Sequence, residues 1–99
     1  MTVVLSIDPG MSLGWALWSD GRLLEYGVFK TSTKASHGSR LWDIYSFILT
    51  LLRQDYVDVC VVENIAAFGK GAKNKDSYLL PAVFGLVRMA AHVHGVEEF

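Results

Sequence analysis

Two short apolar segments of this chain each end in a carboxylate, and they constrain the fold more than any other feature. The first runs from Val3 to Ile7 and is followed by Asp8; the second runs from Val59 to Val62 and is followed by Glu63. Continuous runs of valine, isoleucine and leucine are typical of strands buried on both faces of a sheet. A carboxylate at the end of such a strand is costly unless it is paired, and a divalent cation is a common partner. We therefore expect the two strands to lie side by side and to bring Asp8 and Glu63 to one cation site, an arrangement that favours metal-dependent chemistry on phosphates.

The composition predicts one small globular domain over residues 1–99. The chain has 99 residues, 52% of them apolar, and a formal net charge of −1. No apolar run reaches the roughly 18 residues needed to span a bilayer, and the N-terminus lacks the features of a secretory signal. The single cysteine, Cys60, supports no disulfide framework. We expect a protein of a reducing, cytoplasmic compartment with no membrane partner.

Basic residues cluster in two segments although the net charge is near zero. The first cluster contains Lys30, Lys34, His37 and Arg40, and the second contains Lys70, Lys73 and Lys75. Both clusters fall in segments where we expect loops. Charge alone leaves two interpretations open, ordinary solvated loop residues or surfaces that bind phosphate.

Hydrophobic periodicity and turn residues predict the element order β-β-β-α-β-α. The predicted strands cover residues 2–7, 13–19, 22–29 and 58–63, and the first predicted helix covers residues 40–55. A last helix follows and ends before Gly95. Asp76 or Ser77 can cap its start, or its regular part begins at Pro81. Asp20-Gly21 predicts a tight hairpin turn, Ser39 a helix N-cap and Gly95 a helix C-cap. Gly85 predicts a close approach between the last helix and a neighbouring element. A right-handed crossover through the first helix would place the fourth strand parallel to the first.

Two motifs and the elements between them follow a known pattern. The first motif is Asp8-Pro9-Gly10-x-Ser12-x-Gly14-Trp15-Ala16, and the second is Val62-Glu63 followed by a lysine- and asparagine-containing loop and a helix. In this order and spacing they resemble the RuvC family, the Holliday junction resolvases of bacteria and phages. The resemblance covers essentially the whole chain. It implies an α/β fold of the ribonuclease H-like class, with a mixed sheet, and an enzyme of the crossover junction endodeoxyribonuclease type.

The resemblance also implies roles for particular residues of a two-metal endonuclease that resolves Holliday junctions or other branched DNA. Asp8 would bridge two Mg²⁺ ions, or Mn²⁺ ions, and Glu63 would hold one of them. The implied DNA-facing residues are Ser12, Asn64, Phe68, Lys70, Lys73, Asn74 and Lys75. Among these, Phe68 would stack on bases and the lysines would meet phosphates. Structural alternatives stay open: Asp8 as a turn former, Glu63 as an exposed strand end and Phe68 as a core anchor.

A homodimer is a further implication, because a junction with two-fold symmetry needs two active sites. Trp42, Tyr45 and Phe47 do not share a helical stripe with Leu41 and Ile44, so the first helix is apolar around much of its circumference. That helix and the last helix are equal alternatives for the interface. The family implies the cytoplasm of a bacterium or of a phage-infected bacterial cell.

The family pattern continues past residue 99 with a fifth strand, a further helix and a closing pair of acids. We therefore expect this chain to match about the N-terminal two-thirds of a resolvase, truncated before the fifth strand, with the fourth strand as an exposed edge. Two carboxylates are too few for two ions that each take about six oxygen ligands, so we expect weak or no catalysis from the isolated chain.

Two other functions stay open at this point. One is a non-catalytic DNA-binding or dimerisation module that keeps the fold without the chemistry. The other is a relative of the actin and sugar-kinase class, in which the acid-glycine turn binds nucleotide phosphates.

Overall fold

A computed structural model describes residues 2–10, 12–54, 57–62 and 80–98. Its elements are β1 (Val3–Asp8), β2 (Ser12–Ser19), β3 (Arg22–Lys30), α1 (His37–Gln54), β4 (Val59–Val62), α2 (Leu80–Val93) and β5 (Glu97–Glu98). The predicted order β-β-β-α-β-α is confirmed, and a short fifth strand follows it. None of the helices in the described part of the chain is long and apolar enough to cross a membrane.

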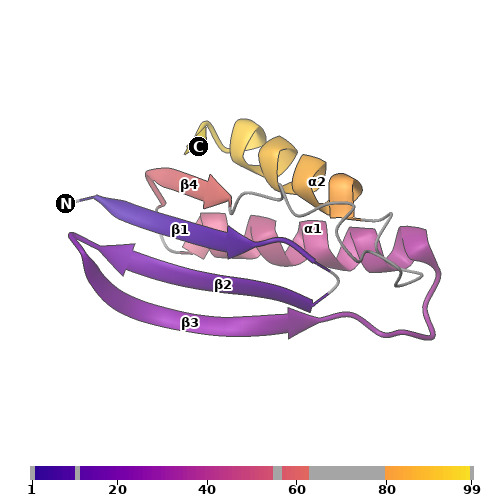
Figure 1. Cartoon of the computed structure of the whole chain (residues 1–99). Coiled ribbons are helices and arrows are strands. Elements are labelled where there is room, and N and C mark those ends of the chain that lie inside the picture. Colours follow the sequence, from indigo (N-terminus) through magenta and orange to yellow (C-terminus); the bar gives the residue numbers. More distant parts are fainter. Residues whose placement is uncertain (1, 11, 55–56, 63–79, 99) are drawn as a thin grey trace.

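The strands form one mixed sheet in the order β3-β2-β1-β4-β5 (Figure 1). β1 pairs antiparallel with β2 and parallel with β4, as the crossover predicts. Helices α1 and α2 pack on each other and on one face of the sheet, where they share a single core with β1, β2 and β4. Members of this core that are fully buried include Leu5, Ile7, Leu13, Ile44, Ile48, Cys60, Val83 and Val87. The opposite face of the sheet carries Ser6 and Asp8, which alternate with the buried residues of β1.

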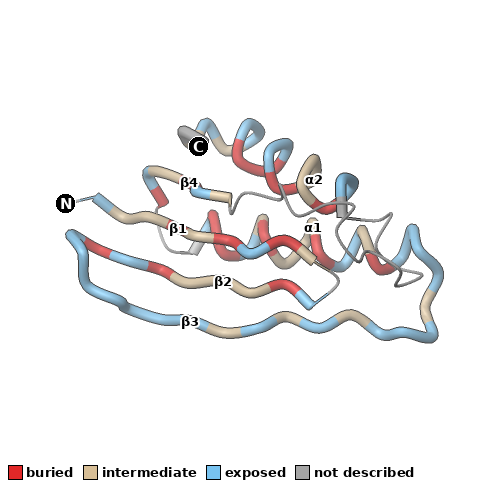
Figure 2. The backbone as a smooth tube through the Cα atoms, viewed as in Figure 1, coloured by how far each residue is buried: buried red, intermediate tan, exposed pale blue. Residues whose placement is uncertain are grey.

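The fourth strand is not the open edge that the sequence predicts. β5 pairs parallel with β4, Val59 beside Glu97 and Cys60 beside Glu98, so β4 has neighbours on both sides at these positions. The long edge is β3, which pairs on one side within the described part of the chain and is mostly exposed in Figure 2. Its exposed apolar residues are Leu23, Leu24, Tyr26 and Val28.

The helix boundaries show which capping predictions hold. α1 begins three residues earlier than predicted because Ser36, not Ser39, caps it: the Ser36 hydroxyl accepts from the Ser39 backbone N–H at 3.2 Å. Gly95 is the predicted C-cap of α2. It has a φ of 65°, and the Val96 N–H donates to the Ala91 carbonyl at 2.9 Å.

A β-bulge decides which residues of β3 face the helices. The hairpin turn at Asp20-Gly21 has positive φ at both residues, as predicted, and Ser19 pairs with Arg22. The register then shifts between Leu17 and Trp18, so that Trp15 lies opposite Gly27. One extra residue in one strand moves every later side chain of that strand to the other face. Gly27 therefore lies beneath the Trp15 indole, whose ring contacts Phe47 of α1 edge-to-face at 6.0 Å.

Replacing Gly27 by alanine should destabilise the fold. A Cβ at this position would lie 3.1 Å from Cζ2 and Nε1 of Trp15, too close for the indole to keep its place. Overpacking of this kind costs about 1–3 kcal/mol, so the melting temperature in thermal unfolding should fall by several degrees. Gly85→Ala is the matched control. Contrary to the predicted close approach, a Cβ there meets no described atom within 4 Å, and alanine in a helix should raise the stability by about 0.5–1 kcal/mol. Equal melting temperatures for the two variants would contradict this packing.

Candidate metal and nucleic-acid site

Asp8 is the last residue of β1 and is exposed on the sheet face opposite the helices. Across the sheet it lies beside Gly14 of β2, where a Cβ would be 3.4 Å from Asp8 Cβ and 3.9 Å from Asp8 Oδ2. The missing side chain leaves the carboxylate open on one flank. A shallow depression of about 240 Å³ lies here, lined by Ser6, Asp8, Gly14, Trp15, Ala16 and Gly27. A ligand of Asp8 therefore has room to approach from this face.

The pairing of β1 with β4 places the residues that precede the two predicted acids side by side. The described pairs run from Val4 beside Val59 to Ile7 beside Val62, and these last residues directly precede Asp8 and Glu63 in the chain. At the other end of the pair, Asp58 holds the register. Its Oδ2 accepts from the Val3 N–H at 2.8 Å, and its own N–H donates to the Val3 carbonyl at 2.9 Å. This role of Asp58 could not be predicted from the sequence, which shows only an aspartate at the start of an expected strand.

Most of the predicted site lies outside the described residues. These positions are Glu63, Asn64, Phe68, Lys70, Lys73, Asn74 and Lys75. Within residues 2–10, 12–54, 57–62 and 80–98, no group of three or more histidine, cysteine, aspartate or glutamate side chains could hold a metal ion. Of the two predicted metal ligands, only Asp8 lies within the described residues.

Ser12 and Lys30 form a cross-strand pair on the same sheet face as Asp8. Ser12 begins β2 and lies opposite Lys30, the last residue of β3, and both are exposed. Ser12 was predicted as a DNA contact, whereas Lys30 was seen only as one member of a basic cluster. The hairpin register could have identified Lys30 as the neighbour of Ser12. The sequence does not show the bulge in β3 that sets this register.

The basic segment 30–40 contains two kinds of residue. Lys30, Lys34 and His37 are exposed, whereas Arg40 is only 4% exposed. The Arg40 Nε donates to the Thr31 hydroxyl at 2.9 Å, so Arg40 ties the end of β3 to α1. The loop expected for this cluster is therefore wrong at Lys30, which ends β3, and at His37 and Arg40, which lie in α1. The buried Arg40 fits neither of the two interpretations left open for the cluster.

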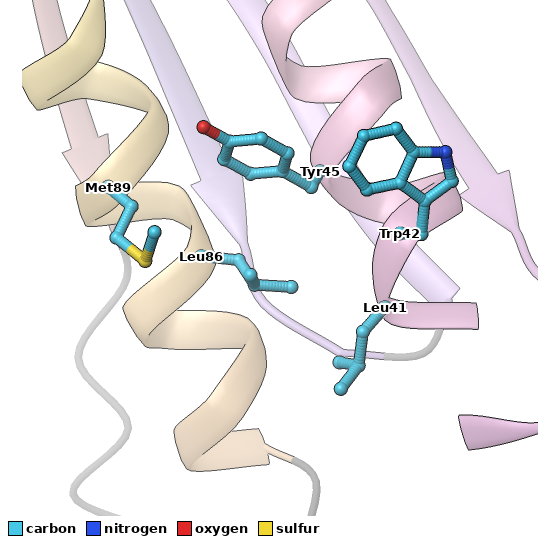
Figure 3. A pocket seen from close by; sticks show the side chains of 5 residues that line it. All are labelled: Leu41, Trp42, Tyr45, Leu86 and Met89. Atoms are coloured by element: carbon cyan, nitrogen blue, oxygen red, sulfur yellow. The ribbon is translucent and has the colours of Figure 1, made fainter. Parts of the chain in front are cut away.

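An apolar groove lies between α1 and α2 on the outer surface of the helical layer (Figure 3). It has a volume of about 230 Å³ and is lined by Leu41, Trp42, Tyr45, Leu86 and Met89. Trp42 is 66% exposed. Phe47 belongs elsewhere: it stacks on Phe29 at 4.4 Å and packs in the core. The predicted apolar circumference of α1 thus divides into a core side and this outer groove.

No family model matches the chain. A crossover junction endodeoxyribonuclease RuvC from Ehrlichia ruminantium (strain Welgevonden) is 36% identical over 104 residues, which cover 97% of this chain and 63% of that protein. RuvC from Ehrlichia chaffeensis is 33% identical over 66 residues. The chain is similar to RuvC over nearly its whole length. It spans less than two-thirds of the length of these RuvC proteins.

The solved structures agree with the sequence relationship. Thermus thermophilus RuvC in complex with a Holliday junction substrate superposes with a TM-score of 0.85 and 27% identity, over 100% of this chain and 63% of that chain. A second T. thermophilus RuvC structure gives a TM-score of 0.80 and 28% identity. The predicted resemblance to RuvC and the predicted mixed-sheet fold of the ribonuclease H-like class are both confirmed.

Proposed function

We propose that this chain is a metal-dependent, structure-selective DNA endonuclease of the crossover junction type, acting on Holliday junctions or other branched DNA. The observation that carries the proposal is the open carboxylate of Asp8 at the end of a buried strand, flanked by the space beside Gly14. The RuvC relatives support it, since one of them is known in complex with a Holliday junction substrate.

The described residues fit a divalent cation such as Mg²⁺ or Mn²⁺. Such ions prefer carboxylate oxygens, and Asp8 offers an exposed carboxylate with room on one side. We assign Asp8 and Glu63 as the ligands that this chain provides, with two ions in the complete site. When bound, the ions would activate a water molecule and stabilise the leaving oxygen. In this proposal, β1 and β4 place the two carboxylates at neighbouring strand ends. The hydrogen bond from the Val3 N–H to Asp58 Oδ2 keeps the two strands in that register.

DNA contacts are proposed on both sides of this site. Ser12 lies near Asp8 on the open sheet face and can donate to a phosphate oxygen. The segment after β4 would supply Asn64, Phe68, Lys70, Lys73, Asn74 and Lys75, with Phe68 stacking on a base and the lysines neutralising phosphates.

A second function is a DNA-binding module without catalysis. It is favoured by the number of assigned carboxylates, since Asp8 and Glu63 are too few for two ions that each take about six oxygen ligands. This module would bind branched DNA equally well with and without metal. Similarity to RuvC structures favours both of these functions over a nucleotide-binding relative of the actin and sugar-kinase class.

We also propose a homodimer, in which a second copy covers the groove between α1 and α2. Two strands of a symmetric junction need two related sites, and a two-fold axis supplies them. The groove is apolar and centred on the exposed Trp42, the type of anchor that dominates interfaces. A formal net charge of −1 gives little repulsion between copies. The bacterial relatives make the cytoplasm of a bacterium, or of a phage-infected bacterial cell, the proposed compartment.

The proposed function is tested with the 99-residue chain and a labelled four-way junction, beside a linear duplex of the same sequence, in Mg²⁺, Mn²⁺ and EDTA. Tighter binding to the junction than to the duplex, with nicking only when metal is present, is the result expected for an endonuclease whose site assembles from this chain. Junction binding that is indifferent to metal, without nicking, identifies the non-catalytic module. Equal binding to junction and duplex would contradict both.

A further inference from the structure

The bulge in β3 places Lys30 on the sheet face that carries Asp8 and at the same end of the sheet. No other lysine of the described chain lies there. Asp8 pairs with Gly14, Gly14 with Val28, and Lys30 follows Val28 by two residues on the same face. β3 runs parallel to β1 because each is antiparallel to β2. The ends of β1 and β3 therefore point the same way (Figure 1).

We propose that Lys30 and Ser12 form a phosphate-binding pair that holds the DNA backbone beside the metal site. The proposal rests on the proposed nuclease or DNA-binding function and adds a specific contact to it. Strand spacings put the Cα atoms of Asp8 and Lys30 about 12 Å apart. That distance is several times the axial rise of about 3.4 Å per nucleotide of one B-form strand, so the phosphate at this pair is a different one from the phosphate at the metal site. The pair would therefore bind a phosphate on the flank of the site opposite β4.

The local charge favours an anion at this pair. Between Glu25 and Asp43 the sequence contains four basic residues and no carboxylate. Lys30 and Lys34 are exposed, so their ammonium groups are accessible to a phosphate group of a DNA backbone. The Ser12 hydroxyl, directly across from Lys30, adds a neutral donor. A flexible lysine with an adjacent hydroxyl is a common arrangement for contacts to phosphate oxygens, which fix position without reading sequence.

The backbone at this end of β3 is held in place. Thr31 follows Lys30 directly, and its hydroxyl accepts a hydrogen bond from the buried Arg40 at 2.9 Å. Arg40 sits in the first turn of α1, whose start is fixed by the Ser36 cap. Lys30 thus projects from a supported strand end rather than from an unsupported loop, which lowers the entropy lost on binding.

Affinity and salt dependence of junction binding in EDTA test the pair. Lys30→Ala should weaken binding about five- to tenfold and reduce the slope of log affinity against log salt by about 1, whereas Lys30→Arg should stay near the unmodified chain. Ser12→Ala should weaken binding by a smaller factor. Arg22→Ala is the matched control: it removes one positive charge from the exposed opposite end of β3 and should change affinity less than about twofold.

The outcomes separate this proposal from the proposed function. If Lys30→Ala and Arg22→Ala have equal effects while the unmodified chain binds the junction, the phosphate-binding pair is wrong and the function stands. If the unmodified chain binds neither junction nor duplex, both are wrong. Circular dichroism of each variant excludes misfolding as the cause, and a folded Lys30→Ala chain with reduced slope confirms the pair.

Discussion

Replacing Asp8 by asparagine should weaken Mn²⁺ binding at least tenfold and reduce metal-dependent junction nicking about a hundredfold or more. The change keeps the shape of the side chain and removes the charge, and a hard cation depends on that charge. Since Asp8 is exposed on the open sheet face, asparagine creates no buried unpaired group, so the melting temperature should stay within a few degrees. Isothermal titration with Mn²⁺ and a junction-nicking assay measure the two effects.

Asp43→Asn is the control for this prediction. Asp43 is an exposed acid of α1, away from the sheet face that carries Asp8, so its loss lowers the total negative charge equally without touching the site. Equal Mn²⁺ affinities for Asp8→Asn and Asp43→Asn would show that the strand end does not hold metal. Junction affinity in EDTA should be the same or slightly higher for Asp8→Asn, because a carboxylate near the DNA backbone is removed.

Replacing Trp42 by glutamate should convert the proposed dimer to a monomer. Trp42 is the most exposed aromatic of the groove between α1 and α2, and a charge there cannot be desolvated against an apolar partner. We expect the dimer dissociation constant to rise at least about thirtyfold, equivalent to about 2 kcal/mol. Light scattering across a concentration series gives the constant.

Tyr26→Ser is the control for the dimer interface. Tyr26 is 74% exposed on the edge strand β3, so it is an aromatic residue of similar exposure on another surface. A monomeric unmodified chain at tens of micromolar would contradict a dimer of this chain. A dimer that Tyr26→Ser disrupts and Trp42→Glu leaves intact would place the interface on the sheet edge instead.

The fold could be predicted because local signals and long-range pairing agree in this chain. The apolar run Val3–Ile7 and the hairpin turn at Asp20-Gly21 determine the first three strands, and the crossover rule places β4 beside β1. The position of Asp8 at the end of β1 could be predicted on the same grounds. The fifth strand was missed because two residues, Glu97 and Glu98, give no hydrophobic period to detect.

The sheet face on which Lys30 lies could not be predicted from the sequence, for a definite physical reason. A regular hairpin closed at Ser19 and Arg22 would pair Ser12 with Phe29 and put Lys30 on the other face. The bulge near Trp18 adds one residue to β3, which reverses the faces from Glu25 onward. Its benefit is that Gly27 comes to lie under the Trp15 indole, a packing relation invisible to a local pattern. The position of a bulge depends on tertiary packing of this kind, so strand propensity alone does not predict where a bulge occurs.

The most direct test of the shared site of Asp8 and Glu63 is a double-mutant cycle on Mn²⁺ affinity, with Asp8→Asn, Glu63→Gln and the double variant. If both carboxylates hold the same ion, each single change weakens binding strongly and the double change adds little, since the effects of residues that share a ligand are not additive. An affinity that Glu63→Gln leaves unchanged, or two losses that simply add, would show that the two strand ends do not form one metal site.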